Sequence, residues 1–334
     1  MGKNNTFEEI WDALSKSKKV LISLHPKPDG DSLGSCVAMK YVLEKMGKKV
    51  TLISKDDISE NLLSFSFIKE VDFGTGLDDL DLEDFDTIIF VDHGHLGGHP
   101  ENIVNKNFPK SMNVINIDHH ETNDFFGKLN YVNPGMISCS IILKELFEKK
   151  GINFDGELCR RLLLGICTDS GFFINGSPGQ AMKVAAFLVE KGGINFTKEF
   201  YNPINQQSVK FKKMLGELFS NINLKKMDGK NIYYSSISKE KLKELGINSS
   251  EVRSGINFLK DLEDTDLIFT LSELGSGEIK GSFRSFTIDT SLFAKEMDGG
   301  GHKGASAFYI KGMSIEQAID EVFRVIKKVG FHEK

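Results

Sequence analysis

The sequence predicts an α/β fold, in which an N-terminal, doubly wound and mainly parallel sheet precedes a smaller C-terminal α+β domain. Three observations support this class. Apolar runs rich in strand formers alternate with helical periodicity over roughly the first 190 residues. The run at 86–92 is nearly continuously apolar, as in parallel strands that are covered on both faces. Later in the chain the pattern changes to alternating strands, two of which are joined by a glycine-rich hairpin signal at 275–277.

In the first half of the chain, helix start and stop signals mark most of the elements. Thr6 and Glu9 form a capping box before the first helix. Gly47 and Gly151 follow two later helices as C-terminal caps, and Pro178 suits the first turn of another. The expected helices are 8–18, 32–46, 138–150, 157–168 and 178–191. The expected strands are 20–25, 49–53, 86–92 and 112–118, and residues 57–85 are expected to be irregular.

The second half begins with a segment, 195–224, that is predicted to be a linker containing a long helix, 206–219, which bridges two domains. The expected strands beyond it are 231–237, 266–274, 278–285 and 307–310. The expected helices are 239–245, 250–262, 292–297 and 314–328, with a glycine-rich turn at 298–302. We therefore predict a first domain over 1–194, the linker over 195–224, and the smaller domain over 225–334.

The overall composition is that of a globular protein with a sizeable core. Of the 334 residues, 40% are hydrophobic and 27% are charged, and the formal net charge is -5. This charge gives no general attraction to long nucleic acid, so a polyanionic substrate must be held by a local cationic site or by metal ions. The four cysteines form no CxxC pair, which favours reduced thiols. Because no run of about 18 apolar residues occurs, we expect no membrane partner and a cytoplasmic location.

Aspartate and histidine side chains follow the predicted strands at the edge where open α/β sheets bind their ligands. Five carboxylates gathered there would repel one another unless cations are bound. Two divalent ions about 3.5–4 Å apart would neutralise them and are typical of phosphoryl hydrolysis. Oxygen-rich ligation with imidazoles favours Mn²⁺, with Mg²⁺ or Co²⁺ as alternatives, over a thiolate zinc site. The residues concerned are His25, Asp29, Asp31, Asp92, Asp118, His119, His120 and Asp169.

Simpler roles compete with this interpretation when each residue is taken alone. An aspartate at a strand or helix end often caps a helix or ends a loop, and only the whole set favours a metal site. Cys36 and Cys139 are expected in the core rather than among the ligands. The loop histidines His93, His95 and His99 are expected to be exposed to solvent, and the sequence leaves their role open.

Four motifs resemble those of the DHH phosphoesterase superfamily. They are His25-Pro-Lys-Pro-Asp29-Gly-Asp31-Ser32, Asp92 after an apolar strand, Asp118-His119-His120, and Asp169. In the second half, Gly281-Ser-Phe-Arg284-Ser285 and Gly299-Gly-Gly-His302 resemble the DHHA1 domain. Within the superfamily, the chain is most similar to nanoRNase/pAp phosphatases and to stand-alone cyclic-di-AMP or pApA phosphodiesterases.

The resemblance implies a role for each matching residue of the first domain. His25 and Asp29 would hold one ion, Asp31, His119 and Asp169 would hold the other, and Asp92 would bridge both. His120 would face the reacting phosphate, and Asp118 would orient a histidine.

The resemblance also implies a substrate site in the second domain. Arg284 would grip phosphate with its guanidinium. The backbone N–H groups of Gly299, Gly300 and Gly301 would form an anion-binding nest, with His302 beside it. Taken alone, Arg284 could instead form a surface salt bridge and the glycines a plain turn.

The activity that the resemblance implies is metal-dependent hydrolysis of short oligoribonucleotides or linear dinucleotides such as pApA, with pAp dephosphorylation as a further activity. Cyclic-di-AMP hydrolysis is one alternative, and a non-catalytic nucleotide sensor is an alternative of another class. Inorganic pyrophosphatase is disfavoured because its Ser-Arg-Lys-Lys signature is missing. The segment after Asp92 lacks an arginine that many relatives carry, and the glycine motif continues with Lys303-Gly304-Ala305, so substrate preference stays open. A homodimer is compatible with the sequence.

Overall fold

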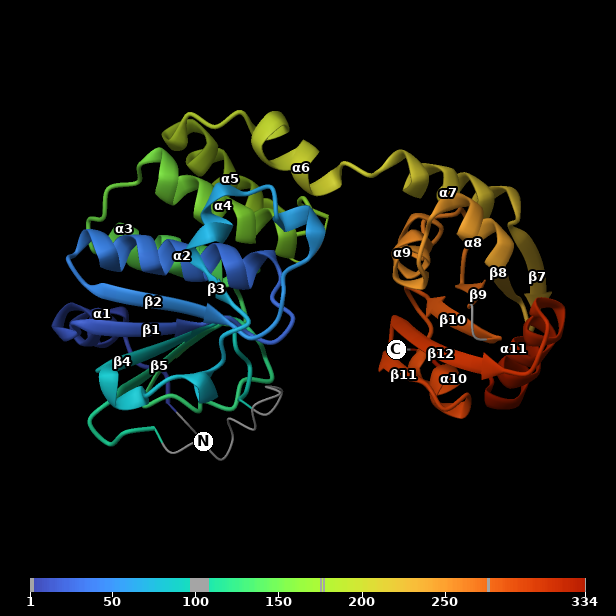
Figure 1. Ribbon diagram of the computed structural model, residues 1–334, viewed down its shortest axis with the longest axis horizontal. Helices are drawn as coiled ribbons and strands as arrows, with labels where there is room; N and C mark the ends of the chain where they lie inside the picture. The colour runs from blue at the N-terminus through green and yellow to red at the C-terminus, as the bar shows by residue number, and fades with distance from the viewer. Residues whose placement is uncertain (1–2, 97–107, 175, 177, 275–276, 334) are drawn as a thin grey trace. The chain divides into compact units, whose positions relative to one another are not determined.

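The computed structural model describes residues 3–96, 108–174, 176, 178–274 and 277–333. Contacts divide the chain into two compact units, Met1–Gln206 and Gln207–Lys334 (Figure 1). His99 and part of the predicted turn at 275–277 lie outside the described residues. Across the described ranges, no helix combines the length and the apolar character that a membrane crossing requires.

The first unit is built on a six-stranded sheet in which every neighbouring pair of strands is parallel. The strand order is β3-β2-β1-β4-β5-β6, so the chain winds in one direction from β1 and in the other from β4. The strands are β1 Lys19–Ser23, β2 Lys49–Ser54, β3 Asp72–Phe73, β4 Thr87–Val91, β5 Asn113–Asp118 and β6 Leu129–Val132. The predicted parallel sheet is confirmed. The short edge strands β3 and β6 were not predicted, and β3 lies in the segment that was expected to be irregular.

Helices α2 to α5 lie on one face of this sheet (Figure 1). The largest hydrophobic core forms between them and residues such as Ile22 and Ile89 of the strands. On the opposite face, Leu77 and Leu82 from 3₁₀ turns pack with Phe90. The helices are α1 Phe7–Lys16, α2 Gly30–Lys45, α3 Cys139–Lys149, α4 Gly156–Asp169, α5 Pro178–Gly192 and α6 Asn202–Asn205. Shorter turns are η1 Glu60–Leu62, η2 Ser66–Glu70, η3 Leu77–Asp79, η4 Leu82–Asp84 and the π-helical turn η6 Thr197–Tyr201.

Helices α2 and α4 approach each other at glycines. A side chain at Gly34 of α2 would collide with the backbone of Arg161 and Gly165 in α4. Because α2 is also covered by the sheet, Leu33, Val37 and other residues all around it are fully buried. The close approach carries the start of α2 and the end of α4 to the same edge of the sheet.

The second unit has a six-stranded sheet of order β11-β12-β10-β9-β8-β7. Strands β8 and β9 are parallel, and the other described pairs are antiparallel. Its strands are β7 Asn223–Met227, β8 Lys230–Ile237, β9 Leu267–Glu273, β10 Glu278–Arg284, β11 Gly300–His302 and β12 Ala305–Lys311. Its helices are α7 Val209–Ser220, α8 Lys239–Leu245, α9 Ser249–Gly255, α10 Ser291–Glu296 and α11 Ile315–Val329, with a 3₁₀ turn η7 at Ile256–Phe258. The predicted smaller α+β domain is confirmed.

The helix that was predicted at 206–219 is α7. Its buried residues Phe211, Met214 and Leu218 pack with Leu242 of α8 and Val252 of α9. Helix α7 is therefore part of the second unit, and the division between the units falls before it.

Candidate metal centre

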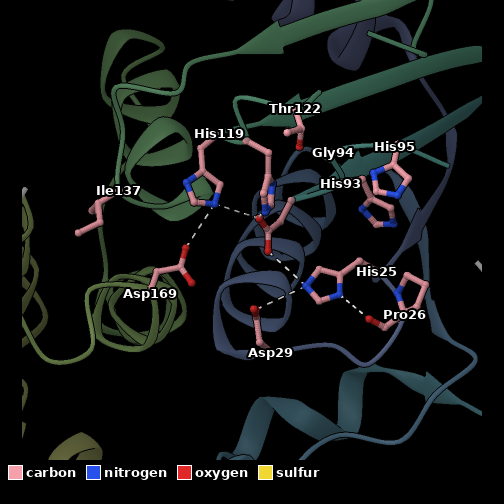
Figure 2. Close-up of a pocket in the computed structure, with 12 residues that line it drawn as sticks. His25, Pro26, Asp29, His93, Gly94, His95, His119, Thr122, Ile137 and Asp169 are labelled. Carbon is pink, nitrogen blue, oxygen red and sulfur yellow. Dashed lines mark hydrogen bonds and ion pairs between the residues drawn. The ribbon is translucent and has the colours of Figure 1, made fainter. Parts of the chain in front are cut away.

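The predicted metal ligands gather at the carboxyl ends of β1 and β4, where the winding direction of the sheet reverses. His25 follows β1, Asp92 follows β4, and Asp118 ends β5. Asp29 caps the N-terminus of α2, and Asp169 is the last residue of α4. The pocket at this edge has a volume of about 660 Å³ (Figure 2). Six of the predicted residues line it, namely His25, Asp29, Asp92, His119, His120 and Asp169.

Asp92 lies between two histidines. Its Oδ2 is 3.4 Å from His25 Nε2, and its Oδ1 is 3.3 Å from His119 Nε2. Each histidine also faces a second carboxylate, because His25 Nε2 is 3.6 Å from Asp29 Oδ1 and His119 Nε2 is 3.4 Å from Asp169 Oδ2. Asp92 is buried and has a φ of 66°, a left-handed conformation that aspartate adopts more readily than most residues. The two oxygens of one carboxylate thus face two separate histidine–carboxylate groups.

The backbone determines which nitrogen of each histidine faces this cluster. His25 Nδ1 lies 2.8 Å from the carbonyl oxygen of Pro26, and His119 Nδ1 lies 3.2 Å from that of Met136. A carbonyl oxygen can only accept, so both Nδ1 atoms carry protons and both Nε2 atoms face carboxylates. An Nε2 lone pair and a carboxylate repel each other unless a proton or a metal ion lies between them. This donor set fits divalent cations, whose histidine ligands usually donate their other N–H to a carbonyl or carboxylate.

Asp31 is fully buried and is held by the first turn of α3. Its Oδ2 accepts a hydrogen bond from Cys139 N at 2.6 Å, and its Oδ1 accepts from Ser140 N at 3.1 Å and from Ser140 Oγ at 2.7 Å. The N-terminus of a helix favours a negative charge at this position. Asp31 also offers an oxygen within 4.8 Å of ligand atoms of Asp92 and His119. Asp31 is therefore oriented by α3 while it faces the same cluster as His119. Ser140 was not among the residues predicted from the sequence.

Cys139 is a core residue, as predicted, but its thiol also lies beside the carboxylate cluster. Both Cys36 and Cys139 are fully buried, as predicted. However, Cys139 Sγ is 3.7 Å from Asp92 Oδ1. Burial, together with the charges of Asp92 and Asp31, raises the pKa of the Cys139 thiol well above its usual value. The protonated thiol is thus a weak hydrogen-bond donor to Asp92.

His120 and Asp118 form a pair beside the cluster. His120 Nδ1 lies 2.8 Å from Asp118 Oδ1, while the half-exposed ring lines the pocket. The hydrogen bond to Asp118 raises the pKa of His120, although burial opposes this effect. This geometry leaves Nε2 of His120 as the nitrogen that a pocket ligand can reach.

The prediction that the loop histidines are exposed was wrong for His93. Its side chain is buried, its Nδ1 lies 3.0 Å from the carbonyl oxygen of Val91, and its ring packs edge-on against Phe90. His95 is exposed, as predicted, and both histidines line the pocket. Burial of His93 could not be predicted because the segment after β4 has no periodic pattern.

Arg284 and the glycine-rich segment line a second pocket, of about 340 Å³, in the second unit. Arg284 Nε donates to Asn257 Oδ1 at 2.9 Å and its Nη1 donates to the carbonyl of Phe283 at 2.8 Å, which fixes the guanidinium at the pocket wall. Residues 300–302 form strand β11 and line the same pocket.

The predicted anion nest does not hold for Gly299. Its N–H donates to the carbonyl of Ala294 at 2.7 Å, so this donor is already used within the fold. A side chain here would collide with the carbonyl oxygen of Ala307. Gly299 therefore allows the chain to approach β12 closely, and Gly300, Gly301 and His302 remain as the candidates for substrate contact.

In the absence of metal, the cluster retains protons at neutral pH. Burial lowers the pKa of His25, but Asp29 and Asp92 outweigh this effect and raise it to about 11. Burial also disfavours the charged form of His119, but Asp92, Asp31 and Asp169 outweigh this effect and raise its pKa to about 10. For Asp169, burial and the charges of Asp31 and Asp92 raise the pKa to about 9. Protons thus occupy positions where metal ions would bind.

We expect Mn²⁺ to bind more tightly as the pH rises from about 6 to about 9, because binding must displace these protons. For each proton that binding releases, the affinity for Mn²⁺ rises by a further factor of about ten per pH unit. Titration calorimetry in two buffers of different ionisation enthalpy would measure the number released. A dissociation constant that does not change with pH would contradict this account.

The raised pKa values also imply that the metal-free fold loses stability over the same range, since the folded state binds more protons than the unfolded state.

The fold and the site define a two-domain protein whose first domain carries an aspartate–histidine centre able to hold divalent cations. Residues 19–166 match the N-terminal domain of the DHH family, and residues 212–328 match the DHHA1 domain. The chain therefore contains a DHH-family N-terminal domain followed by a DHHA1 domain, as its motifs implied.

Several relatives match over nearly the whole chain. The bifunctional oligoribonuclease and PAP phosphatase NrnA of Thermus thermophilus is 24% identical over 312 residues, which are 92% of this chain and 89% of the relative. The protein of the same name from Mycoplasma genitalium is 25% identical over 336 residues, which are 99% of this chain and 100% of the relative. An exopolyphosphatase-related protein from Bacteroides fragilis shares the fold, with a TM-score of 0.80 and 23% identity over 96% of this chain and 95% of that one.

Proposed function

We propose that the chain is a metal-dependent phosphodiesterase that hydrolyses short oligoribonucleotides or linear dinucleotides such as pApA to mononucleotides. The observation that carries this proposal is the position of Asp92, whose two oxygens face two histidine–carboxylate groups. Two cations about 3.5–4 Å apart are the usual arrangement for in-line displacement at phosphorus. The names of the relatives, bifunctional oligoribonuclease and PAP phosphatase, support this substrate class and favour a second activity on pAp.

The residues of the first unit divide the work in this proposal. His25 and Asp29 would hold one ion, Asp31, His119 and Asp169 would hold the other, and Asp92 would contribute to both. Divalent cations, with Mn²⁺ favoured over Mg²⁺ or Co²⁺, supply Lewis-acid activation of water and phosphate when bound. His120 donates a hydrogen bond from Nε2–H to the substrate phosphate, while Asp118 accepts a hydrogen bond from Nδ1–H and fixes the ring.

The second unit favours short substrates in this proposal. Arg284 and His302 line one pocket, where they hold the terminal phosphate or nucleotide. The net charge of the chain is -5, so there is no general electrostatic attraction for a long polyanion. Affinity then comes from one end of the substrate, and additional nucleotides add little to it.

The proposal is tested by steady-state rates with Mn²⁺ on RNAs of different length, together with pApA, cyclic-di-AMP, pAp and pyrophosphate. We expect kcat/KM to fall steeply between two and about ten nucleotides. We expect pApA to exceed its cyclic form, because a ring presents no free end. Equal efficiency at all lengths would contradict the short-substrate proposal. Tight binding of pApA without any metal-stimulated product would favour a nucleotide sensor instead.

Replacing Arg284 with alanine should reduce kcat/KM for pApA far more than for bis-p-nitrophenyl phosphate, a small diester that needs only the metal centre. Loss of one charge-assisted contact costs about 1.5–3 kcal/mol, which is about 10- to 150-fold in rate. Arg324→Ala is the control, because it removes an arginine of the same unit that pairs with Glu321 on α11. Equal losses on both substrates would count against a substrate-binding role for Arg284.

A further inference from the structure

A buried asparagine contacts Asp118 behind the predicted catalytic pair. Asn123 follows the Asp118-His119-His120 motif and is 9% exposed. Its Nδ2 donates to Asp118 Oδ2 at 2.6 Å and to Asn116 Oδ1 at 2.9 Å, and it also lies 3.0 Å from the carbonyl oxygen of His93. Its Oδ1 accepts a hydrogen bond from Phe125 N at 2.7 Å. Both polar atoms of this side chain are therefore used.

These contacts hold Asp118 from two sides. One carboxylate oxygen faces His120 Nδ1 and the other faces Asn123. An ionised carboxylate only accepts hydrogen bonds, so Asn123 must present its amide nitrogen here. Asp118 has no exposed surface, and water cannot easily replace a lost donor. The plane of the carboxylate, and with it the orientation of the His120 ring, thus depends on Asn123.

We propose that Asn123 is a positioning residue for phosphodiester hydrolysis that acts through Asp118 on His120. By fixing Asp118, it orients the Nδ1–H of His120 and thereby directs the Nε2–H of the same ring toward the substrate phosphate. The inference rests on the proposed function, in which His120 contacts the phosphate. It adds a residue to which neither the sequence motifs nor the metal cluster assigns a role.

Asn123→Ser separates positioning from folding. A serine hydroxyl can still accept from the Phe125 N–H and preserve the turn, but it is too short to donate to Asp118. With bis-p-nitrophenyl phosphate and Mn²⁺, we expect kcat to fall about 10- to 100-fold, with little change in KM and with bound manganese retained. In a His120→Ala background, the same substitution should cost less than about twofold, because residues that act as a unit are non-additive.

Asn130→Ala is the matched control for loss of a buried amide. Asn130 lies in β6, and its side chain hydrogen-bonds the backbone of Gly127. This variant should lose stability and keep kcat.

If Asn123→Ser lowers kcat by the same factor in both backgrounds, or leaves kcat unchanged in the otherwise native chain, the inference is overturned while the proposed function stands. If His120→Ala is fully active, the role of His120 in the proposed function fails as well.

A protein that does not fold as Asn123→Ser can be examined as Asn123→Thr. The threonine hydroxyl can still accept from the Phe125 N–H and its methyl group fills more of the buried space, but the side chain is too short to donate to Asp118. We expect a loss of kcat about as large as for serine. Full activity of Asn123→Thr would overturn the inference.

Discussion

Replacing Asp92 with alanine is expected to lower turnover by about a thousand-fold or more, which corresponds to roughly 4 kcal/mol of transition-state stabilisation. The reason is that both oxygens of this one carboxylate face histidines of the centre, at 3.4 Å and 3.3 Å. Its removal affects both predicted cation positions at once. Elemental analysis of the purified variant should show less manganese, and kcat on bis-p-nitrophenyl phosphate should fall with it.

Two further variants separate the carboxylate of Asp92 from its backbone conformation and from its neighbours. Asp92→Asn keeps the volume and tolerates the left-handed φ of 66°, so it should show nearly the same loss. Asp118→Ala removes a carboxylate that contacts His120 rather than the two facing histidines, and should cost about 10- to 100-fold with manganese retained. An Asp92→Ala protein with half the native activity would contradict the dinuclear proposal.

Replacing Gly165 with alanine should destabilise the first unit and weaken the metal centre together. A methyl group at this position of α4 would overlap Asp31 Oδ1 and Ser140 Oγ, which are buried and hydrogen-bonded to each other. Overpacking and the loss of those contacts together cost about 2–5 kcal/mol of unfolding free energy. Chemical denaturation would measure the loss, and a manganese titration would show weaker binding.

Gly179→Ala is the control for this prediction. Gly179 lies in α5 of the same unit, and nothing lies within 4 Å of the position that its side chain would occupy. Its replacement should change the unfolding free energy by less than about 1 kcal/mol and leave manganese binding intact. If both alanine variants were equally stable, the close packing of Asp31 against α4 would not matter for stability.

Much of the candidate centre could be predicted because its residues directly follow apolar strands. Strand β4 is a nearly continuous apolar run and β5 carries three apolar residues, and Asp92 and Asp118 stand at their ends. In a parallel sheet those ends meet at one edge, so spacing along the sequence translates into proximity in space. Asp169 could be placed in the same way, since the helix that carries it has a clear apolar pattern.

The residues that support the centre could not be predicted in this way. Ser140 is 109 positions from Asp31, and nothing local indicates that the first turn of α3 will hold that carboxylate. Asn123 lies in a loop without periodicity, and its contacts depend on how the loop folds back. Gly299 was assigned to an anion site because glycine runs suit both nests and close packing, and only its bond to Ala294 distinguishes the two.

The contact between α2 and α4 has a consequence for the size of ion that the centre can accept. These helices touch backbone to backbone at Gly34, while Asp31 is the second residue of α2 and Asp169 is the last residue of α4. The backbone positions from which the two carboxylates extend are therefore held close together by main-chain contact. Calcium needs oxygens at about 2.3–2.6 Å, whereas magnesium takes them at about 2.0–2.1 Å. If both carboxylates hold one ion, as proposed, a spacing fixed at Gly34 and Gly165 would make the centre select ions by radius.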